Sequence, residues 1–401
     1  MRHETVRTPG RPDTFAPSRA STATGVVHPG THDTVTNTGA GMDITAAVVR
    51  EGKGQFTIEK LELQAPRAGE LIVEIKGVGL CHTDLTARDQ ILPAPLPAVF
   101  GHEGSGIVQA VGEGVTKVKV GDKVAVGFAT CGECGTCKDD DSAYCHNFAP
   151  LNYGGVQGDG TTTLTQDGNV VHGSFFGQSS FASYALTTER NVVPVGDDVP
   201  LEILGPLGCG IMTGAGAVTN SLKVTKGSTL LILGGGPVGL AAAMGGAIQE
   251  AEHIIVSEPV AARRDLAIEL GATHAIDPTT GDLGELVRAI APAGANFVVD
   301  TTGIPEVIAG SVAAAAFHAT YGILAVPPAL DIMTPIPYLP LLALGLSIRG
   351  IQEGDAEPDV YIPQMLEWHK AGKFPFDKLI TTFPLSQINE AVDAQHRGEA
   401  V

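Results

Sequence analysis

The stretch "LLILGGGPVGL", residues 230–240, carries the pattern that decides the fold of this 401-residue chain. Its leading apolar residues predict a buried strand, and Gly234, Gly236 and Gly239 then form a G-x-G-x-x-G arrangement that opens a helix. Glycines let the backbone turn tightly and approach a pyrophosphate, which the free N–H groups of the helix bind. The stretch predicts a dinucleotide site, and an ordinary tight turn is the alternative.

Strands and helices alternate around this motif. Strands are predicted at 229–233, 253–257, 274–276, 296–300, 320–326 and 346–350, and helices at 238–249, 261–270, 283–291 and 305–315. Six strands with crossover helices predict an α/β fold with a doubly wound parallel six-stranded sheet of the Rossmann type. Glu258 follows the second strand, where an acidic residue binds the adenosine ribose, and it favours NAD because a carboxylate repels the 2′-phosphate of NADP. Arg263 is a further candidate cofactor-binding residue, and it and Arg264 are the residues that could instead reach such a phosphate.

The sequence before the motif is β-rich. The stretches "LIVEIKGVGLC" and "GSGIVQAVGEGVTKVKVGDKVAVG" alternate apolar residues with glycine and charge at short spacing, as strands joined by turns do. After Gly350, "MLEWHKAGKF" and "INEAVDAQHRG" predict amphipathic helices. We therefore expect one domain built from residues 43–210 together with 350–401, and a dinucleotide-binding domain over residues 211–349.

The first residues differ from the rest of the chain. Residues 1–41 are rich in Thr, Pro and Gly, hold no lysine, and offer no apolar core for a secretory signal. We predict a disordered extension over residues 1–42, with a targeting segment as the alternative.

Composition excludes some partners. A formal charge of -19 and a pI near 4.9 repel the phosphate backbone, so no nucleic-acid partner is expected. The longest apolar run, residues 230–248, contains six glycines and a proline, which suits a strand, turn and helix better than a membrane span. Six cysteines in 401 residues favour a reducing compartment, and we expect a cytoplasmic protein without a membrane partner.

Four cysteines crowd one short segment, "TCGECGTCKDDDSAYCHN", at Cys131, Cys134, Cys137 and Cys145. Four soft thiolates can close a tetrahedron around zinc and replace the apolar core that such a loop lacks. Redox chemistry of a C-x-x-C pair is the alternative, but it would leave the third and fourth cysteines superfluous. We expect His146 and the neighbouring acidic run to be solvated.

The two remaining cysteines lie far apart, Cys81 in "GVGLCHTDL" and Cys209 in "GPLGCGIMTG". Between them, "GHEGSGIVQAVGEGV" carries His102 and Glu103. One histidine and two cysteines from separate segments would give a zinc with three protein ligands and a fourth position open to substrate.

These motifs together resemble the zinc-dependent medium-chain alcohol dehydrogenases over residues 43–401, and "CHTDLTARDQILPAPLPAVFGHEG" is most similar to the aryl-alcohol (benzyl alcohol) dehydrogenases. The resemblance implies a β-rich GroES-like catalytic domain, two zinc ions per subunit, NAD, and a homo-oligomer, dimer or tetramer. The implied reaction moves a hydride between a primary alcohol and NAD and gives an aldehyde. A terpenoid, aliphatic or thiol-adduct alcohol is the alternative substrate, and a non-catalytic cofactor-binding module is the alternative class.

The resemblance also assigns the metal ligands. It implies that Cys81, His102 and Cys209 hold the catalytic zinc, and that the four-cysteine lobe holds a structural zinc. Glu103 would lie behind the catalytic metal as an occasional ligand, and Asp84 would hydrogen-bond the ring of His102.

Further roles follow from the same resemblance. Thr83 matches the hydroxyl that takes the proton of the alcohol, while Thr213 and Val238 match residues that pack on the nicotinamide. The residues that would line the substrate pocket are Leu92, Phe128 and Phe175, and plain core packing is the alternative for each.

Two positions depart from the pattern of many relatives. Thr86 stands where a histidine carries the proton to solvent, and threonine cannot serve as a base. His82 stands where an arginine binds the pyrophosphate, and we expect it to bind the cofactor in a pH-dependent way, with plain solvent exposure as the alternative.

Overall fold

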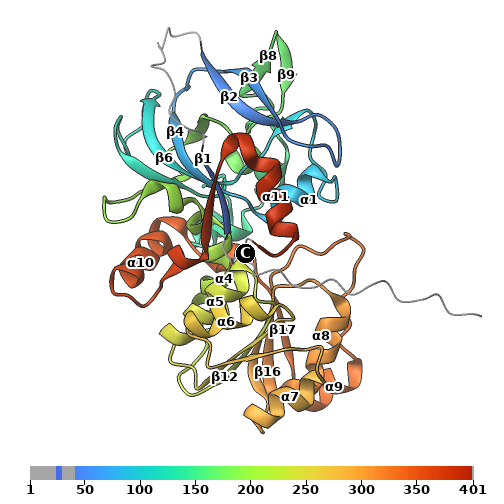
Figure 1. The fold of residues 1–401 in the computed structure, drawn as a ribbon. Coiled ribbons are helices and arrows are strands. Elements are labelled where there is room, and N and C mark those ends of the chain that lie inside the picture. Colours follow the sequence, from blue (N-terminus) through green and yellow to red (C-terminus); the bar gives the residue numbers. More distant parts are fainter. Residues whose placement is uncertain (1–23, 29–40, 400–401) are drawn as a thin grey trace, which may run out of the picture.

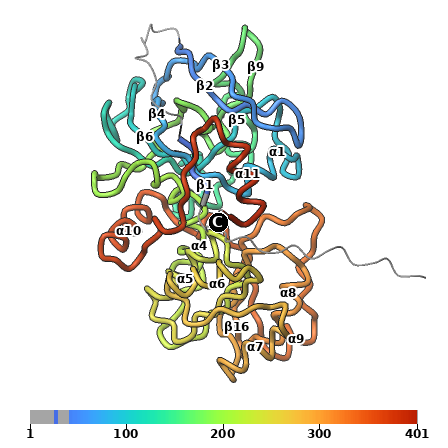
Figure 2. The backbone as a smooth tube through the Cα atoms, in the orientation of Figure 1, coloured from blue at the N-terminus to red at the C-terminus, as the bar shows by residue number. Residues whose placement is uncertain are grey.

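The computed structural model describes residues 24–28 and 41–399, which form a β-rich part and an α/β part (Figure 1). The blue-to-green segments make up most of the β-rich part, and the yellow and orange segments make up the α/β part. The red helices α10 (Pro358–Lys370) and α11 (Ile388–His396) lie with the β-rich part although they come last in the chain (Figure 2).

The α/β part contains a six-stranded sheet in which every pair is parallel, in the order β14-β13-β12-β15-β16-β17. Its strands are β12 (Thr229–Leu233), β13 (His253–Ser257), β14 (His274–Ile276), β15 (Ala295–Asp300), β16 (Ala315–Ile323) and β17 (Ser347–Gly350). The predicted doubly wound parallel sheet is confirmed. β16 begins earlier than predicted, because its first residues are alanines that suit a helix as well as a strand.

Five helices connect these strands: α5 (Pro237–Ile248), α6 (Ala261–Glu269), α7 (Leu283–Ile290), α8 (Pro305–Ser311) and α9 (Tyr338–Leu344). Successive residues of β12 supply two cores, because side chains of a strand alternate between its faces. Leu230 and Ile232 belong to the large core that continues into the β-rich part, while Leu231 and Leu233 belong to a second core on the other face.

The β-rich part contains two further sheets. One has seven strands, in the order β11-β7-β6-β4-β1-β18 with β10 also paired to β4, and the other has five, in the order β5-β2-β3-β8-β9. Their strands are β1 (Thr24–His28), β2 (Met42–Val49), β3 (Thr57–Leu63), β4 (Glu70–Gly79), β5 (Ala98–Val99), β6 (Glu103–Val111), β7 (Lys123–Val126), β8 (Leu164–Gln166), β9 (Asn169–Val171), β10 (Tyr184–Thr188), β11 (Val192–Pro194) and β18 (Ile380–Pro384).

Short helices carry the segments between these sheets and into the α/β part. They are α1 (His82–Arg88), α2 (Gly135–Lys138), η1 (Ser142–Tyr144), α3 (Phe148–Tyr153), η2 (Phe175–Gly177), η3 (Leu201–Ile203), η4 (Gly205–Gly208), α4 (Gly210–Gly216), η5 (Ala217–Ser221), η6 (Val312–Ala314), η7 (Glu353–Asp355), η8 (Phe376–Leu379) and η9 (Leu385–Gln387). Among the residues that the structure describes, no helix is long and apolar enough to cross a membrane.

The predicted disordered extension over residues 1–42 is wrong for residues 24–28. These residues form β1, which lies parallel to β18 and antiparallel to β4. Val26 and Val27 are fully buried there. The composition did not reveal this strand because its two valines stand alone among Thr, Gly and Pro, and its stability depends on partner strands distant in sequence. Residues 1–23 and 29–40 lie outside the described part of the chain.

Candidate active site and metal centres

Four side chains from distant segments meet in the interior of the β-rich part. Cys81 is the N-cap of α1, His102 directly precedes β6, Glu103 is the first residue of β6, and Cys209 directly precedes α4. One ligand atom of each lies within 4.8 Å of the others. Nε2 of His102 is 3.2 Å from Sγ of Cys209. We call these four residues the catalytic cluster.

Asp84 fixes the geometry of this cluster. It is fully buried, and its carboxylate accepts hydrogen bonds from the backbone N–H groups of Cys81 (3.1 Å) and Gly101 (2.9 Å). It also pairs with Nδ1 of His102 at 2.9 Å, which leaves Nε2 turned toward the sulfur of Cys209. A histidine oriented by a carboxylate in this way is typical of metal ligands.

Glu103 is the buried carboxylate of the cluster. Its Oε1 accepts a hydrogen bond from the backbone N–H of Gly210 at 3.0 Å. Gly79 leaves room for this carboxylate, because a Cβ there would stand 1.8 Å from Oε2 of Glu103. Burial, and next the charge of Cys81, raise the pKa of Glu103 to about 8. A carboxylate held so far from water favours a nearby cation.

The donor set of the catalytic cluster fits zinc. A hydrogen bond from Cys209 lowers the pKa of Cys81, so one sulfur is ready to act as an anionic ligand. The same contact and burial raise the pKa of Cys209, whose proton a metal would displace. Two sulfurs, one imidazole nitrogen and a carboxylate behind them match the ligands that zinc prefers, and three of them leave a position open.

A cavity of 420 Å³ opens onto this cluster. The predicted site residues on its wall are Cys81, His82, Thr83, Cys209, Thr213 and Val238. Thr83 Oγ1 lies 3.7 Å from Sγ of Cys81, so a hydroxyl stands beside the cluster. Thr86 is buried and its hydroxyl donates to the backbone oxygen of Thr83 at 2.9 Å, so its side chain is already engaged.

The prediction that Leu92, Phe128 and Phe175 line the substrate pocket is not met in this cavity, because none of them is on its wall. Leu92 is not on its wall, Phe128 lines a different cavity, and Phe175 is buried with its ring centroid 5.0 Å from that of Phe176. Phe176 takes the expected place, since its backbone adopts a left-handed φ of 51° and its ring stacks on His102 at 4.4 Å between centroids. Tyr153, at the end of α3, is the second aromatic residue on the wall.

The cofactor motif has the backbone that its sequence predicted. Gly234 adopts a positive φ of 98°, and Gly236 is the N-cap of α5. At Gly239 a Cβ would stand 2.0 Å from the backbone oxygen of Gly234, so only glycine permits this approach of helix and strand. Glu258 accepts hydrogen bonds from the backbone N–H groups of Gly235 and Val260, each at 2.8 Å. The acidic residue therefore lies beside the glycine turn.

The basic residues beyond Glu258 differ in their surroundings. Arg264 donates to the backbone oxygens of Glu258 (2.8 Å) and Pro259 (2.7 Å) and pairs with Asp277 at 3.1 Å. Nε of Arg263 has no hydrogen-bond partner in the described chain. Of the two arginines, only Arg264 is engaged by a carboxylate, which leaves Arg263 as the cofactor candidate that the sequence named.

The four-cysteine lobe is a second candidate metal centre. The ligand sulfurs of Cys131, Cys134, Cys137 and Cys145 lie within 4.8 Å of one another, and those of Cys131 and Cys137 are 4.0 Å apart. Sulfurs around a tetrahedral zinc would stand about 3.8 Å apart, given a Zn–S bond of about 2.3 Å. His146 is exposed and stands outside this group, so the thiols complete the set alone.

Backbone N–H groups point at the sulfurs of this lobe. Cys145 accepts from the N–H of Cys131 at 3.3 Å, and Cys131 accepts from that of Cys134 at 3.4 Å. The hydroxyl of Thr136 and further backbone bonds lower the pKa of Cys134 to about 5, whereas burial raises that of Cys137 to about 12. Such N–H groups stabilise thiolates, which a zinc site requires.

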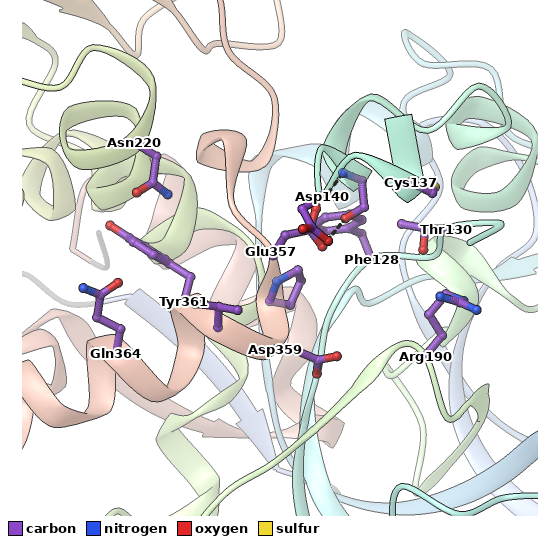
Figure 3. A pocket seen from close by; sticks show the side chains of 13 residues that line it. Phe128, Thr130, Cys137, Asp140, Arg190, Asn220, Glu357, Asp359, Tyr361 and Gln364 are labelled. Atoms are coloured by element: carbon purple, nitrogen blue, oxygen red, sulfur yellow. Dashed lines mark hydrogen bonds between the residues drawn. The ribbon is translucent and has the colours of Figure 1, made fainter. Parts of the chain in front are cut away.

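The lobe contacts the loop at residues 350–357, which begins at the last residue of β17. Ser142 of η1 donates from its N–H (2.6 Å) and its hydroxyl (2.7 Å) to the carboxylate of Glu357. The hydroxyl of Tyr144 lies within hydrogen-bond distance of two acceptors, the backbone oxygen of Gly350 (3.1 Å) and Oδ1 of Asp355 (2.7 Å). Figure 3 shows Glu357 beside the lobe, on the wall of a second cavity of 480 Å³ that Cys137 and Arg190 also line. These hydrogen bonds therefore connect the lobe to the loop that follows the last strand of the parallel sheet.

Comparison with known proteins agrees with this arrangement. Residues 67–197 match the alcohol dehydrogenase GroES-like domain, and residues 237–371 match the zinc-binding dehydrogenase domain. The chain is 49% identical over 358 residues to a geraniol dehydrogenase from Castellaniella defragrans, a match that covers 89% of this chain and 95% of that protein.

Two solved structures share the fold. An alcohol dehydrogenase zinc-binding domain protein from Burkholderia ambifaria is 44% identical, with a TM-score of 0.87 over 89% of this chain and 97% of that one. The benzyl alcohol dehydrogenase of Acinetobacter calcoaceticus is 40% identical, with a TM-score of 0.86 and the same coverage. The chain belongs to the zinc-dependent medium-chain alcohol dehydrogenases, whose cofactors are zinc and NAD.

Proposed function

We propose that this protein transfers a hydride between a primary alcohol of the aryl, benzyl type and NAD, and so interconverts the alcohol and its aldehyde. One observation carries the proposal: the catalytic cluster and the cofactor edge of the sheet open into the same cavity. Cys81 and Cys209 lie on its wall together with Thr213 and Val238, which the family places against the nicotinamide. An alcohol held there would meet the metal and the cofactor together.

The chain's own residues have defined tasks in this reaction. When bound, zinc supplies a Lewis acid that lowers the pKa of the alcohol, and NAD supplies the acceptor for the hydride. The hydroxyl of Thr83 accepts the proton of the alcohol at Oγ1 and donates its own hydrogen onward. Asp84 keeps Nε2 of His102 turned to the cluster, and the exposed ring of His82 lies at the cavity wall, where it would contact the cofactor.

The cavity wall supports a flat apolar substrate. Phe176 and Tyr153 contribute aromatic rings to it, and Leu324, Ala325 and Val326 add apolar side chains. The second candidate is a terpenoid alcohol, because the relative with 49% identity is a geraniol dehydrogenase. Aliphatic and thiol-adduct alcohols belong to the same alternative. A non-catalytic cofactor-binding module remains the alternative of a different class, and the complete ligand set opposes it.

A panel of alcohols, assayed with NAD and with NADP, tests this proposal. We expect kcat/KM with NAD to be higher for benzyl alcohol than for geraniol and for linear aliphatic alcohols. A preference for geraniol would assign the terpenoid alternative, and a zinc-loaded protein that binds NAD but oxidises no alcohol would assign the non-catalytic one. Higher kcat/KM with NADP would contradict the role given to Glu258.

We further propose a homo-oligomer in the cytoplasm, without a nucleic-acid or membrane partner. Its support is the apolar face of α9, where Tyr338, Leu339 and Leu342 are 80%, 70% and 67% exposed next to the exposed edge strand β17. Large exposed apolar patches of this kind mark protein interfaces. Light scattering on Leu342→Arg tests it: we expect a dimer or tetramer to dissociate, and an unchanged mass would reject this face.

A further inference from the structure

One buried carboxylate near the catalytic cluster has no task in the chemistry described above. Glu353 lies in the 350–357 loop and is only 8% exposed. Its backbone adopts a left-handed φ of 50°, which is unfavourable for a residue with a side chain and is common at functional positions. Its Oε2 is buried and has no hydrogen-bond partner in the described part of the chain. An unsatisfied buried acceptor destabilises a fold, so this one calls for a ligand that donates to it.

The surroundings of Glu353 place it at the cofactor side of the cavity. It lines the 420 Å³ cavity together with Thr213 and Ile351. Burial raises its pKa to about 7, while the Cys209 thiol and the Thr213 hydroxyl, which face the carboxylate, lower it. Glu353 does not belong to the set of ligand atoms that lie within 4.8 Å of one another in the catalytic cluster. It therefore stands beside the metal centre and not in it.

The sheet order shows which part of the cofactor reaches this position. Ligands of doubly wound sheets bind along the carboxyl ends of the strands. Glu258 follows β13 and the glycine turn follows β12, so the adenosine and the pyrophosphate occupy that half of the edge. Besides Val238 of α5, the residues of this edge that line the cavity follow β15, β16 and β17, namely Thr301, Thr302, Leu324, Ala325, Val326, Ile351, Gln352 and Glu353. A cofactor that extends from the glycine turn along this edge brings its nicotinamide end into the cavity that Glu353 lines.

We propose that Glu353 accepts a hydrogen bond from the carboxamide N–H of the nicotinamide and so fixes the rotation of that ring in the cavity. The carboxamide is the neutral donor that NAD brings to this end, and Oε2 of Glu353 is the buried acceptor that has no partner among the described residues of this cavity, whose wall also includes the apolar Ile351, Leu324 and Ala325. A buried hydrogen bond of this kind gives orientation as well as affinity. The inference rests on the proposed use of NAD and adds the residue that recognises its reactive end.

Binding of three ligands to the purified zinc-loaded protein tests the inference by calorimetry. NAD has the carboxamide, its 3-acetylpyridine analogue carries an acetyl group without an N–H in that place, and ADP-ribose lacks the ring. We expect Glu353→Leu to weaken NAD binding on the order of ten- to a hundredfold, because the carboxamide N–H would be left buried without an acceptor. Affinities for the analogue and for ADP-ribose should stay the same.

A conservative variant and a matched control complete this test. Glu353→Gln retains an acceptor oxygen and should lose less NAD affinity than Glu353→Leu. Asp359→Asn is the matched control, because Asp359 is an exposed carboxylate that pairs with Lys117 at 2.6 Å, and it should bind all three ligands like the wild type. Glu353→Leu should also unfold at the same temperature or a higher one, because it removes an unpaired buried acceptor.

The inference is overturned if Glu353→Leu weakens all three ligands equally, or if it leaves NAD affinity unchanged. A wild-type protein that binds neither NAD nor ADP-ribose would instead refute the proposed function, and the inference with it. Selective loss of NAD affinity in a stably folded variant supports both.

Discussion

The catalytic cluster and the four-cysteine lobe use the same sulfur chemistry but are built in opposite ways. The ligands of the catalytic cluster come from three separate segments, the last of which lies more than a hundred residues after the other two, and the folded core brings them together. Those of the lobe lie within fifteen residues of one another, in a loop with little apolar core of its own. Metal should therefore hold the lobe together, whereas the surrounding core should hold the catalytic cluster even without metal.

The two centres are also connected through the structure. The lobe does not stand apart from the active site, because Ser142 and Tyr144 bind the 350–357 loop that carries Glu353 into the cavity. A structural metal in the lobe would thus stabilise the cofactor side of the catalytic cavity.

The largest effect is expected from removing one ligand of the catalytic cluster. Cys81→Ser should lower turnover by about a thousandfold or more, because the Lewis acid is worth several kcal/mol of transition-state stabilisation. Its unfolding temperature should stay close to that of the wild type. Cys134→Ser, the matched lobe variant, should unfold several degrees lower in a thermal melt. If both variants lose stability equally, the two centres do not differ as described.

An intermediate effect is expected from the carboxylate behind the histidine. Asp84→Asn keeps the size of the side chain but loses the charge that orients His102, and should lower zinc affinity or activity by about 10- to 100-fold. Competition with a chelator would measure the change. Zinc in the lobe should be unaffected, and release of the lobe zinc at the same chelator concentration would contradict the assignment.

The thiols of the metal-free protein should differ in reactivity. The pKa of Cys134 is lowered to about 5, so this thiol is ionised at pH 7, and its rate of alkylation should fall only as the pH drops toward 5. Cys137, with a pKa raised to about 12, should react at least about tenfold more slowly at pH 7 because it stays protonated. Mass spectrometry after brief alkylation would rank them. Equal rates would mean that the hydrogen bonds at Cys134 do not stabilise its thiolate.

The smallest effect should come from the contact between the lobe and the loop. Tyr144→Phe removes the hydroxyl that binds Gly350 and Asp355, each bond being worth about 1 kcal/mol. We expect NAD to bind a few-fold more weakly, while ADP-ribose binds as before. Calorimetry on the zinc-loaded variant measures both. Unchanged NAD affinity would show that the loop holds its position without the lobe.

Local patterns made much of this molecule predictable. The glycines from Gly234 to Gly239 and the spacing of the lobe cysteines each act within one short segment, so their structure follows from the sequence nearby. The positions of Cys81, His102 and Cys209 depend on the whole fold, so their residue types suggested a zinc site and the resemblance to a family then assigned its ligands.

Other features of the structure could not be predicted from the sequence. Phe175 and Phe176 are adjacent and chemically identical, and only the left-handed backbone at Phe176 decides which ring faces the cavity. Glu353 sits in a short acidic loop that is typical of a solvated turn, and its burial comes from packing against α4. Strand β1 depends in the same way on the distant strands β4 and β18.

Counting zinc per subunit in the wild type, Cys81→Ser and Cys134→Ser by mass spectrometry tests the central claim most directly. The account predicts two zinc ions in the wild type and one in each variant, with turnover abolished in Cys81→Ser. Two zinc ions and wild-type turnover in Cys81→Ser would contradict it.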